Sequence, residues 1–84
     1  MNQNDFQNLV VGSTAALKPF ALKLTRDVND AEDLIQDTIV RAMTNYDKFN
    51  LGTNIKAWLY TIMRNIFINN YRRNKKRNTM IDTT

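Results

Sequence analysis

The chain has 84 residues, of which 43% are hydrophobic and 24% charged, and its formal net charge is +4; this is the composition of one small globular domain. Because cysteine and histidine are absent, disulfides, thiolate metal sites and the commonest general base are excluded, and most hydrolytic and redox chemistry is not expected. The sequence has no run of about 18 apolar residues, so no membrane span is predicted. No signal-peptide pattern is visible in the first residues, so we expect a cytoplasmic protein without membrane insertion.

The sequence predicts an all-α fold, a compact bundle of three to four helices. It contains two glycines and one proline and no alternating strand pattern. The first helix is expected from Phe6 to Arg26, with Asp5 as its N-cap. Pro19 has no N–H to donate, so it predicts a kink or a division into two short helices.

The second helix is expected to begin at Asn29 or Asp30 and to end near Asp47. Asn29 and Glu32 have the spacing of a capping box, and acidic residues in the first turn suit the helix dipole. One face at helical spacing is suited to the core. Its members are Ala31, Leu34, Ile35, Thr38, Ala42 and Tyr46.

The third helix is expected to begin after Thr53 or Asn54, either of which can cap it, and to run to about Arg73. Its apolar stripe comprises Ile55, Trp58, Leu59, Ile62 and Ile66. The predicted core of the domain comprises Leu24, Leu34, Ile35, Ala42, Trp58, Leu59 and Ile62. The sequence after Arg77 has no pattern and is predicted to be disordered.

The second helix carries an acidic surface opposite its core face. That surface comprises Glu32, Asp33, Gln36, Asp37 and Asp47, with Val40 and Met43 among them. Apolar side chains within an acidic face indicate a protein partner. Two alternatives remain open: a solvated face, and a magnesium site in which Asp33 and Asp37, one turn apart, supply oxygen ligands.

The charges divide the chain into two halves. Residues 1–50 carry seven acidic and five basic side chains, whereas residues 51–84 carry one acidic and seven basic ones, five of them within residues 72–77. A basic end favours a polyanion, with nucleic acid before anionic lipid. A solvated basic tail that binds nothing specific is the alternative.

The third helix has the residue types of a nucleic-acid surface. Arginines hold phosphates, and aromatic rings stack on unpaired bases. The residues concerned are Trp58, Tyr60, Phe67 and Tyr71, interleaved with Arg64, Arg72 and Arg73. A second set shares one flank of the helix: Trp58, Thr61, Asn65 and Arg72. Asn65 could pair with base edges through its amide. Alternatively, Trp58 and Phe67 belong to the core and Asn65 to the ordinary surface.

Three segments resemble region two of bacterial extracytoplasmic-function (ECF) sigma factors. They are DAEDLIQDTIVRA at 30–42, YDKF at 46–49 and NIKAWLYTIMRNIFINNYRR at 54–73. The first has the acidic, hydrophobic and glutamine pattern of the polymerase-binding segment, and the last has asparagine seven residues after tryptophan. The resemblance covers about residues 6–77.

The resemblance implies a protein that is not an enzyme and needs no cofactor or metal. It implies binding to core RNA polymerase through the clamp helices of the beta-prime subunit, and to the non-template strand of the promoter minus-ten element, with help in melting DNA. The implied polymerase surface comprises Glu32, Asp33, Gln36, Asp37 and Val40. In the implied DNA site, Phe49 and the following loop, Asn50, Leu51, Gly52 and Thr53, wall a pocket for a flipped base. Asn65 reads that base, and Arg64, Arg72 and Arg73 hold the backbone. Trp58 and Thr61 complete the expected DNA surface.

We expect residues 1–77 to form the region two domain and residues 78–84 to begin a disordered interdomain linker. Members of this family carry a second, helix-turn-helix domain, which is absent from this chain, and the resemblance also implies an anti-sigma factor as a partner. Asn50, Leu51 and Gly52 depart from the charged residue that relatives often place after the phenylalanine, so the preferred base does not follow.

Two other classes of function compete with the sigma-factor interpretation. One is a helical protein-interaction adaptor with a nonspecific nucleic-acid-binding surface. The other is a carboxylate-dependent metalloenzyme, which would lack histidine and a second carboxylate-bearing helix.

Overall fold

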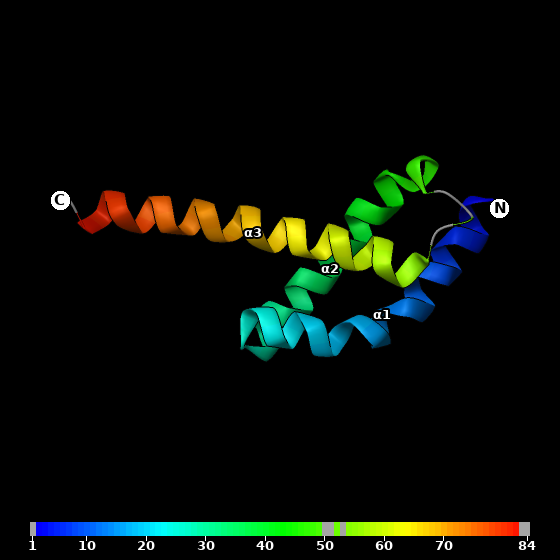
Figure 1. Ribbon diagram of the computed structural model, residues 1–84, viewed down its shortest axis with the longest axis horizontal. Helices are drawn as coiled ribbons and strands as arrows, with labels where there is room; N and C mark the ends of the chain where they lie inside the picture. The colour runs from blue at the N-terminus through cyan, green and yellow to red at the C-terminus, as the bar shows by residue number, and fades with distance from the viewer. Residues whose placement is uncertain (1, 50–51, 53, 83–84) are drawn as a thin grey trace.

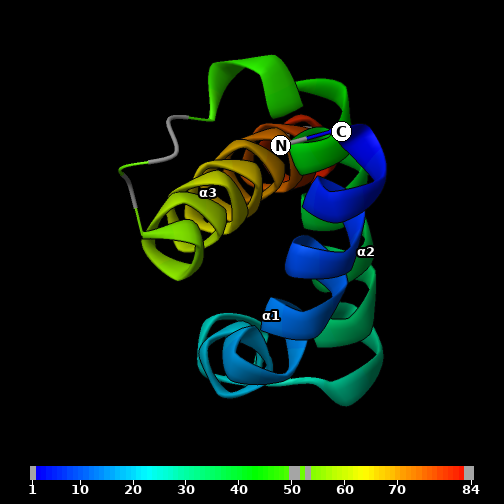
Figure 2. The ribbon, with the colours of Figure 1, turned by 90° about the vertical axis from the view of Figure 1, so that its right-hand side faces the viewer.

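The computed structural model describes residues 2–49, 52 and 54–82, with side chains up to residue 73. The described residues form α1 (Gln3–Thr25), α2 (Val28–Thr44), the short 3₁₀ helix η1 (Tyr46–Lys48) and α3 (Ile55–Asp82), without a strand among them. Each α-helix packs against the other two. Figures 1 and 2 show α1 and α2 running side by side in opposite directions, with α3 lying across them. The predicted all-α bundle is confirmed.

Helix α1 begins earlier than predicted. The side chain of Asn2 accepts a hydrogen bond from the N–H of Asp5 at 2.8 Å, so Asn2 is the N-cap and Asp5 lies in the first turn. The prediction of Asp5 as cap was therefore wrong. Pro19 lies inside α1, which stays one helix. Figure 1 shows that its axis changes direction between the N-terminal and C-terminal parts, as expected because Pro19 donates no hydrogen bond to the preceding turn.

The turn between α1 and α2 is tighter than the sequence predicts. Arg26 adopts a left-handed conformation with φ of 59°, and its N–H donates to the Leu22 carbonyl at 2.7 Å. Asp27 then caps α2 by accepting from the N–H of Asp30 at 3.0 Å. The predicted capping box at Asn29 was wrong, because the chain reverses within two residues and leaves the cap position to Asp27.

Helix α2 ends at Thr44, three residues before the predicted end, and η1 follows. The Asn45 side-chain amide donates to the Arg41 carbonyl at 2.9 Å, and its backbone N–H also donates there at 3.1 Å. These bonds satisfy a carbonyl at the end of the helix, so the chain leaves α2 at this point. At the next helix start, Asn54 caps α3 by accepting from the N–H of Lys56 at 3.0 Å, as one of the two predicted caps.

Helix α3 is longer than predicted, because its backbone is helical through Asp82 rather than to about Arg73. No glycine or proline follows Asn54 to stop it. Figure 1 shows its C-terminal part projecting beyond the bundle. The backbone of residues 78–82 continues this helix. A helical end that projects from a bundle frays readily in water, which is consistent with the predicted disordered tail. Residues 83 and 84 lie outside the described residues.

The core lies where the three helices meet. Its buried members are Phe6, Val10, Leu17, Ala21, Ala31, Leu34, Ala42, Leu59, Met63 and Ile66. Of the predicted core, Leu34, Ala42 and Leu59 are buried. The other four, Leu24, Ile35, Trp58 and Ile62, are partly buried and pack against the core. Met63 was not predicted, although it lies four residues after Leu59 and three before Ile66, on the same stripe of α3.

Candidate nucleic-acid and protein interfaces

The C-terminal end of α2, η1 and α3 border an open hollow of about 290 Å³. We call it the α2–α3 pocket. Its lining consists of Arg41, Asn45, Lys48, Trp58, Ile62 and Asn65. Three elements that are separate in the sequence therefore bring two cations, two amides and an indole ring together.

The α2–α3 pocket has the chemistry to hold a single nucleic-acid strand. Arg41 and Lys48 are exposed and can contact phosphates. Trp58 is only partly buried and lines the pocket, so its indole can contact a base that enters there. The exposed amide of Asn65 can both donate to and accept from a base edge. The pocket thus combines backbone and base contacts in one place.

Of the predicted DNA residues, the structure brings Trp58 and Asn65 together. Thr61 is exposed, and its hydroxyl donates to the Ala57 carbonyl at 3.0 Å. Arg72 is exposed seven residues beyond Asn65, hence on the same flank of α3. Arg64 and Arg73 are also exposed but lie on other sides of the helix, at about 100° per residue.

Two pocket cations, Arg41 and Lys48, were not predicted as DNA contacts. They belong to the half of the chain with a net negative charge, so the charge distribution of the sequence does not point to them. A signal was available at Arg41, because it is the only basic residue of α2 and lies in the helix's last turn. Lys48 lies within the YDKF segment, in which the family resemblance implies a DNA role only for Phe49.

The loop residues Asn50, Leu51 and Thr53 lie outside the described residues, and Gly52 is exposed. Phe49 is half-buried and contacts the rings of Phe6 and Trp58, with centroid distances of 5.6 and 5.2 Å. It is not among the described residues that line the α2–α3 pocket. Its contact with Trp58 nevertheless places it behind one wall of that pocket.

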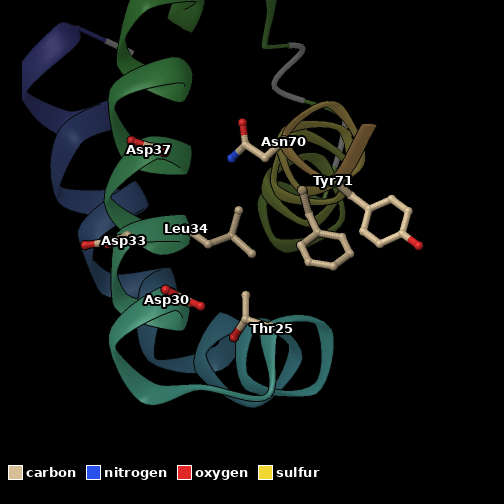
Figure 3. Close-up of a pocket in the computed structure, with 8 residues that line it drawn as sticks. Thr25, Asp30, Asp33, Leu34, Asp37, Asn70 and Tyr71 are labelled. Atoms are coloured by element: carbon tan, nitrogen blue, oxygen red, sulfur yellow. The ribbon is translucent and has the colours of Figure 1, made fainter. Parts of the chain in front are cut away.

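The acidic surface of α2 is accessible. Glu32, Asp33, Gln36 and Asp37 are exposed, and Val40 is 64% exposed. One edge of this surface borders a second hollow, of about 370 Å³, which we call the acidic hollow. It is lined by Thr25, Asp30, Asp33, Leu34, Asp37, Phe67, Asn70 and Tyr71. Figure 3 shows the three aspartates spaced along α2, with Leu34 and Asn70 pointing into the gap between α2 and α3.

The aromatic residues of α3 do not form one surface. Trp58 lines the α2–α3 pocket, whereas Phe67 and Tyr71 line the acidic hollow and stack on each other at 6.5 Å. Tyr60 packs against Phe20 of α1 at 5.2 Å. The four rings that the sequence interleaves with arginines therefore lie on different flanks of α3, as the helical period requires.

The described part of the chain contains no group of three or more histidine, cysteine, aspartate or glutamate side chains that could hold a metal ion. Among the described helices, none is both long and apolar enough to span a membrane.

Comparison with known proteins shows the family of this domain. Residues 13–77 match the family described as Sigma-70 region 2. The ECF RNA polymerase sigma factor EcfG of Rhodopseudomonas palustris is 39% identical over 67 residues, which are 80% of this chain and 37% of that protein. The ECF RNA polymerase sigma factor SigM of Bacillus subtilis is 38% identical over 63 residues, covering 75% and 38% of the two chains.

A solved structure agrees with these relatives. The sigma factor RpoE, in complex with the anti-sigma factor NepR from Bartonella quintana, superposes with a TM-score of 0.86 and 38% identity, over 95% of this chain and 50% of that one. The described residues form a small helical domain with exposed carboxylates on α2 and exposed cations at the α2–α3 pocket. The chain belongs to the sigma-70 region 2 family, of the ECF type. It spans about two fifths of the length of the curated relatives.

Proposed function

We propose that this domain acts in transcription initiation, by docking on the clamp helices of core RNA polymerase and by holding the non-template strand of the promoter minus-ten element while DNA melts. The observation that carries the proposal is the α2–α3 pocket, which gathers Trp58, Asn65 and two cations in a chain of this family. The proposal assigns no catalytic step to the domain and places it in the cytoplasm, where polymerase works.

In the proposed DNA complex, an unpaired base enters the α2–α3 pocket. A base removed from the duplex loses its stacking, and contacts in the protein offset that loss. Trp58 supplies an apolar face, and Asn65 supplies hydrogen bonds to the base edge. Arg41 and Lys48 hold adjacent phosphates, with Arg72 further along the same flank of α3, and Arg64 and Arg73 on other sides of the helix contact the backbone where the strand passes them. Phe49 and the loop 50–53 complete the proposed site.

The proposed polymerase surface is the acidic surface of α2. Its members are Glu32, Asp33, Gln36, Asp37 and Val40. Carboxylates around an exposed valine favour a partner that presents cations beside an apolar patch, because complementary potentials speed association and select the partner. We further propose that an anti-sigma factor binds the parent protein, since the similar RpoE was crystallised with one.

The first test measures base selection. Wild-type protein, Asn65→Ala and the control Asn69→Ala are titrated with single-stranded DNA oligonucleotides that differ from a minus-ten-like strand in one base at a time. Asn69 is a matched control, because it is an exposed asparagine one turn along α3 that does not line the pocket. We expect Asn65→Ala to lose affinity mainly for the preferred base, by about 1–3 kcal/mol if the contact is bidentate, and Asn69→Ala to keep the preference.

The second test separates backbone contacts from base contacts. Arg72→Ala should weaken all strands about equally and lower the salt slope by about 0.7 for each lost phosphate contact on single strands. Lys18→Ala, which removes an exposed cation on α1, is the control. Equal weakening of every strand by Asn65→Ala would refute the base pocket and leave only a nonspecific basic surface.

A further inference from the structure

A cluster of four aromatic rings joins the start of α1 to the elements around the α2–α3 pocket. Phe6 is at its centre, with centroid distances of 5.9 Å to Tyr46, 5.6 Å to Phe49 and 5.8 Å to Trp58. Phe49 and Trp58 also contact each other at 5.2 Å. Phe6 is therefore the one described residue whose ring contacts all three of the others.

The cluster connects the two ends of the segment 50–53. Phe49 immediately precedes that segment, and its N–H donates to the Tyr46 carbonyl at 3.1 Å. Trp58 lies in the first turn of α3, and its N–H donates to the Asn54 carbonyl at 3.1 Å. Phe6 contacts the ring on each side, so it packs against both η1's end and the start of α3.

Phe6 is itself held firmly. It is 2% exposed, and its N–H donates to the Asn2 carbonyl at 3.0 Å, in the turn that the Asn2 side chain caps. A ring buried on every side cannot shift without moving its neighbours, because protein interiors are closely packed. Among those neighbours, Trp58 is a wall of the pocket.

We infer that Phe6 is a positioning residue for base selection: it determines where the Trp58 indole lies relative to Asn65, although Phe6 is not among the residues that line the pocket. The inference rests on the proposed function and deepens it. It predicts that the shape of the Phe6 ring, and not only its apolar bulk, determines how well the domain distinguishes one base from another, since tilted and edge-on ring contacts depend on geometry.

The test compares Phe6→Leu with Leu17→Ala. Leu17 is a matched control, because it is also 2% exposed, lies three turns along α1, and takes part in none of these ring contacts. Each variant is titrated with the same set of single-base oligonucleotides at two salt concentrations. We expect Phe6→Leu to flatten the preference between bases by about three- to tenfold with an unchanged salt slope, and Leu17→Ala to retain the preference.

Trp58 provides a second readout, because it is the only tryptophan of the chain. Its fluorescence emission should shift in folded Phe6→Leu and stay unchanged in Leu17→Ala. If Phe6→Leu does not fold, Tyr46→Leu replaces it: Tyr46 is 39% exposed and contacts Phe6 from the η1 side, so its loss should flatten the preference by about twofold.

The outcomes separate the inference from the function on which it rests. A wild-type domain without any base preference would refute the proposed function. A wild-type preference that folded Phe6→Leu, or Tyr46→Leu in its place, retains in full would overturn the inference alone. A preference lost equally in Leu17→Ala would also overturn it, because the effect would then follow stability rather than ring position.

Discussion

Leu59 gives the most direct test of how this small domain is held together. Its side chain is 0% exposed and lies on the stripe of α3 that faces α1 and α2. Leu59→Ala removes three carbon groups, worth about 0.8 kcal/mol each in lost burial. The cavity left behind adds a further cost, of about 24 cal/mol per Å³ that does not collapse. The free energy of unfolding should therefore fall by about 2–5 kcal/mol.

That loss is large against the whole. At about 0.05–0.15 kcal/mol per residue, the 84 residues give a total stability of about 4–13 kcal/mol. Urea titration followed by circular dichroism measures the change, with Val40→Ala as control. Val40 is 64% exposed, so its truncation should change stability by less than about 0.5 kcal/mol. If Leu59→Ala costs no more than Val40→Ala, the core assigned to α3 is wrong.

The remaining predictions concern the ends and faces of α2. Asp37→Lys, alone or with Asp33→Lys, should weaken binding to core polymerase in a pull-down while the circular dichroism spectrum is unchanged, and Asp5→Lys, an exposed position on α1, serves as the charge-matched control; unchanged binding in the double variant would remove this surface from consideration. Asp27→Ala should lower the free energy of unfolding in urea by about 0.5–2 kcal/mol, because it removes the cap of α2, whereas Asn29→Ala should have little effect; the opposite order would restore the capping box that the sequence predicts.

The sequence predicts the helices well because glycine and proline are scarce and apolar residues recur at helical spacing, most clearly in α2. It is less accurate at the ends, where several residues compete for one role. Asn2 and Asp5 are both good caps, as are Asp27 and Asn29, and only the backbone geometry decides between them. At Arg26 a left-handed turn by a residue other than glycine fixes the start of α2, and no local pattern predicts that conformation.

The candidate site was predictable only in part, for a related reason. Trp58 and Asn65 lie on one helix, so helical spacing alone places them on one flank. Arg41 and Lys48 reach the same pocket from α2 and η1, and that contact depends on how the helices cross. Likewise, Phe6 is distant in sequence from Phe49 and Trp58, and only the packing of α1 brings their rings together.

The charges of α2 suit its stability and its proposed partners at the same time. The helix dipole favours carboxylates near the N-terminus and cations near the C-terminus. Asp30 lies in the first turn of α2 and Arg41 in the last. Asp30 lines the acidic hollow, and Arg41 lines the α2–α3 pocket. The carboxylate of the acidic hollow and the cation of the pocket therefore each lie at the end of α2 where the helix dipole favours their charge. In the proposed function, polymerase and the DNA strand therefore contact different stretches of one helix.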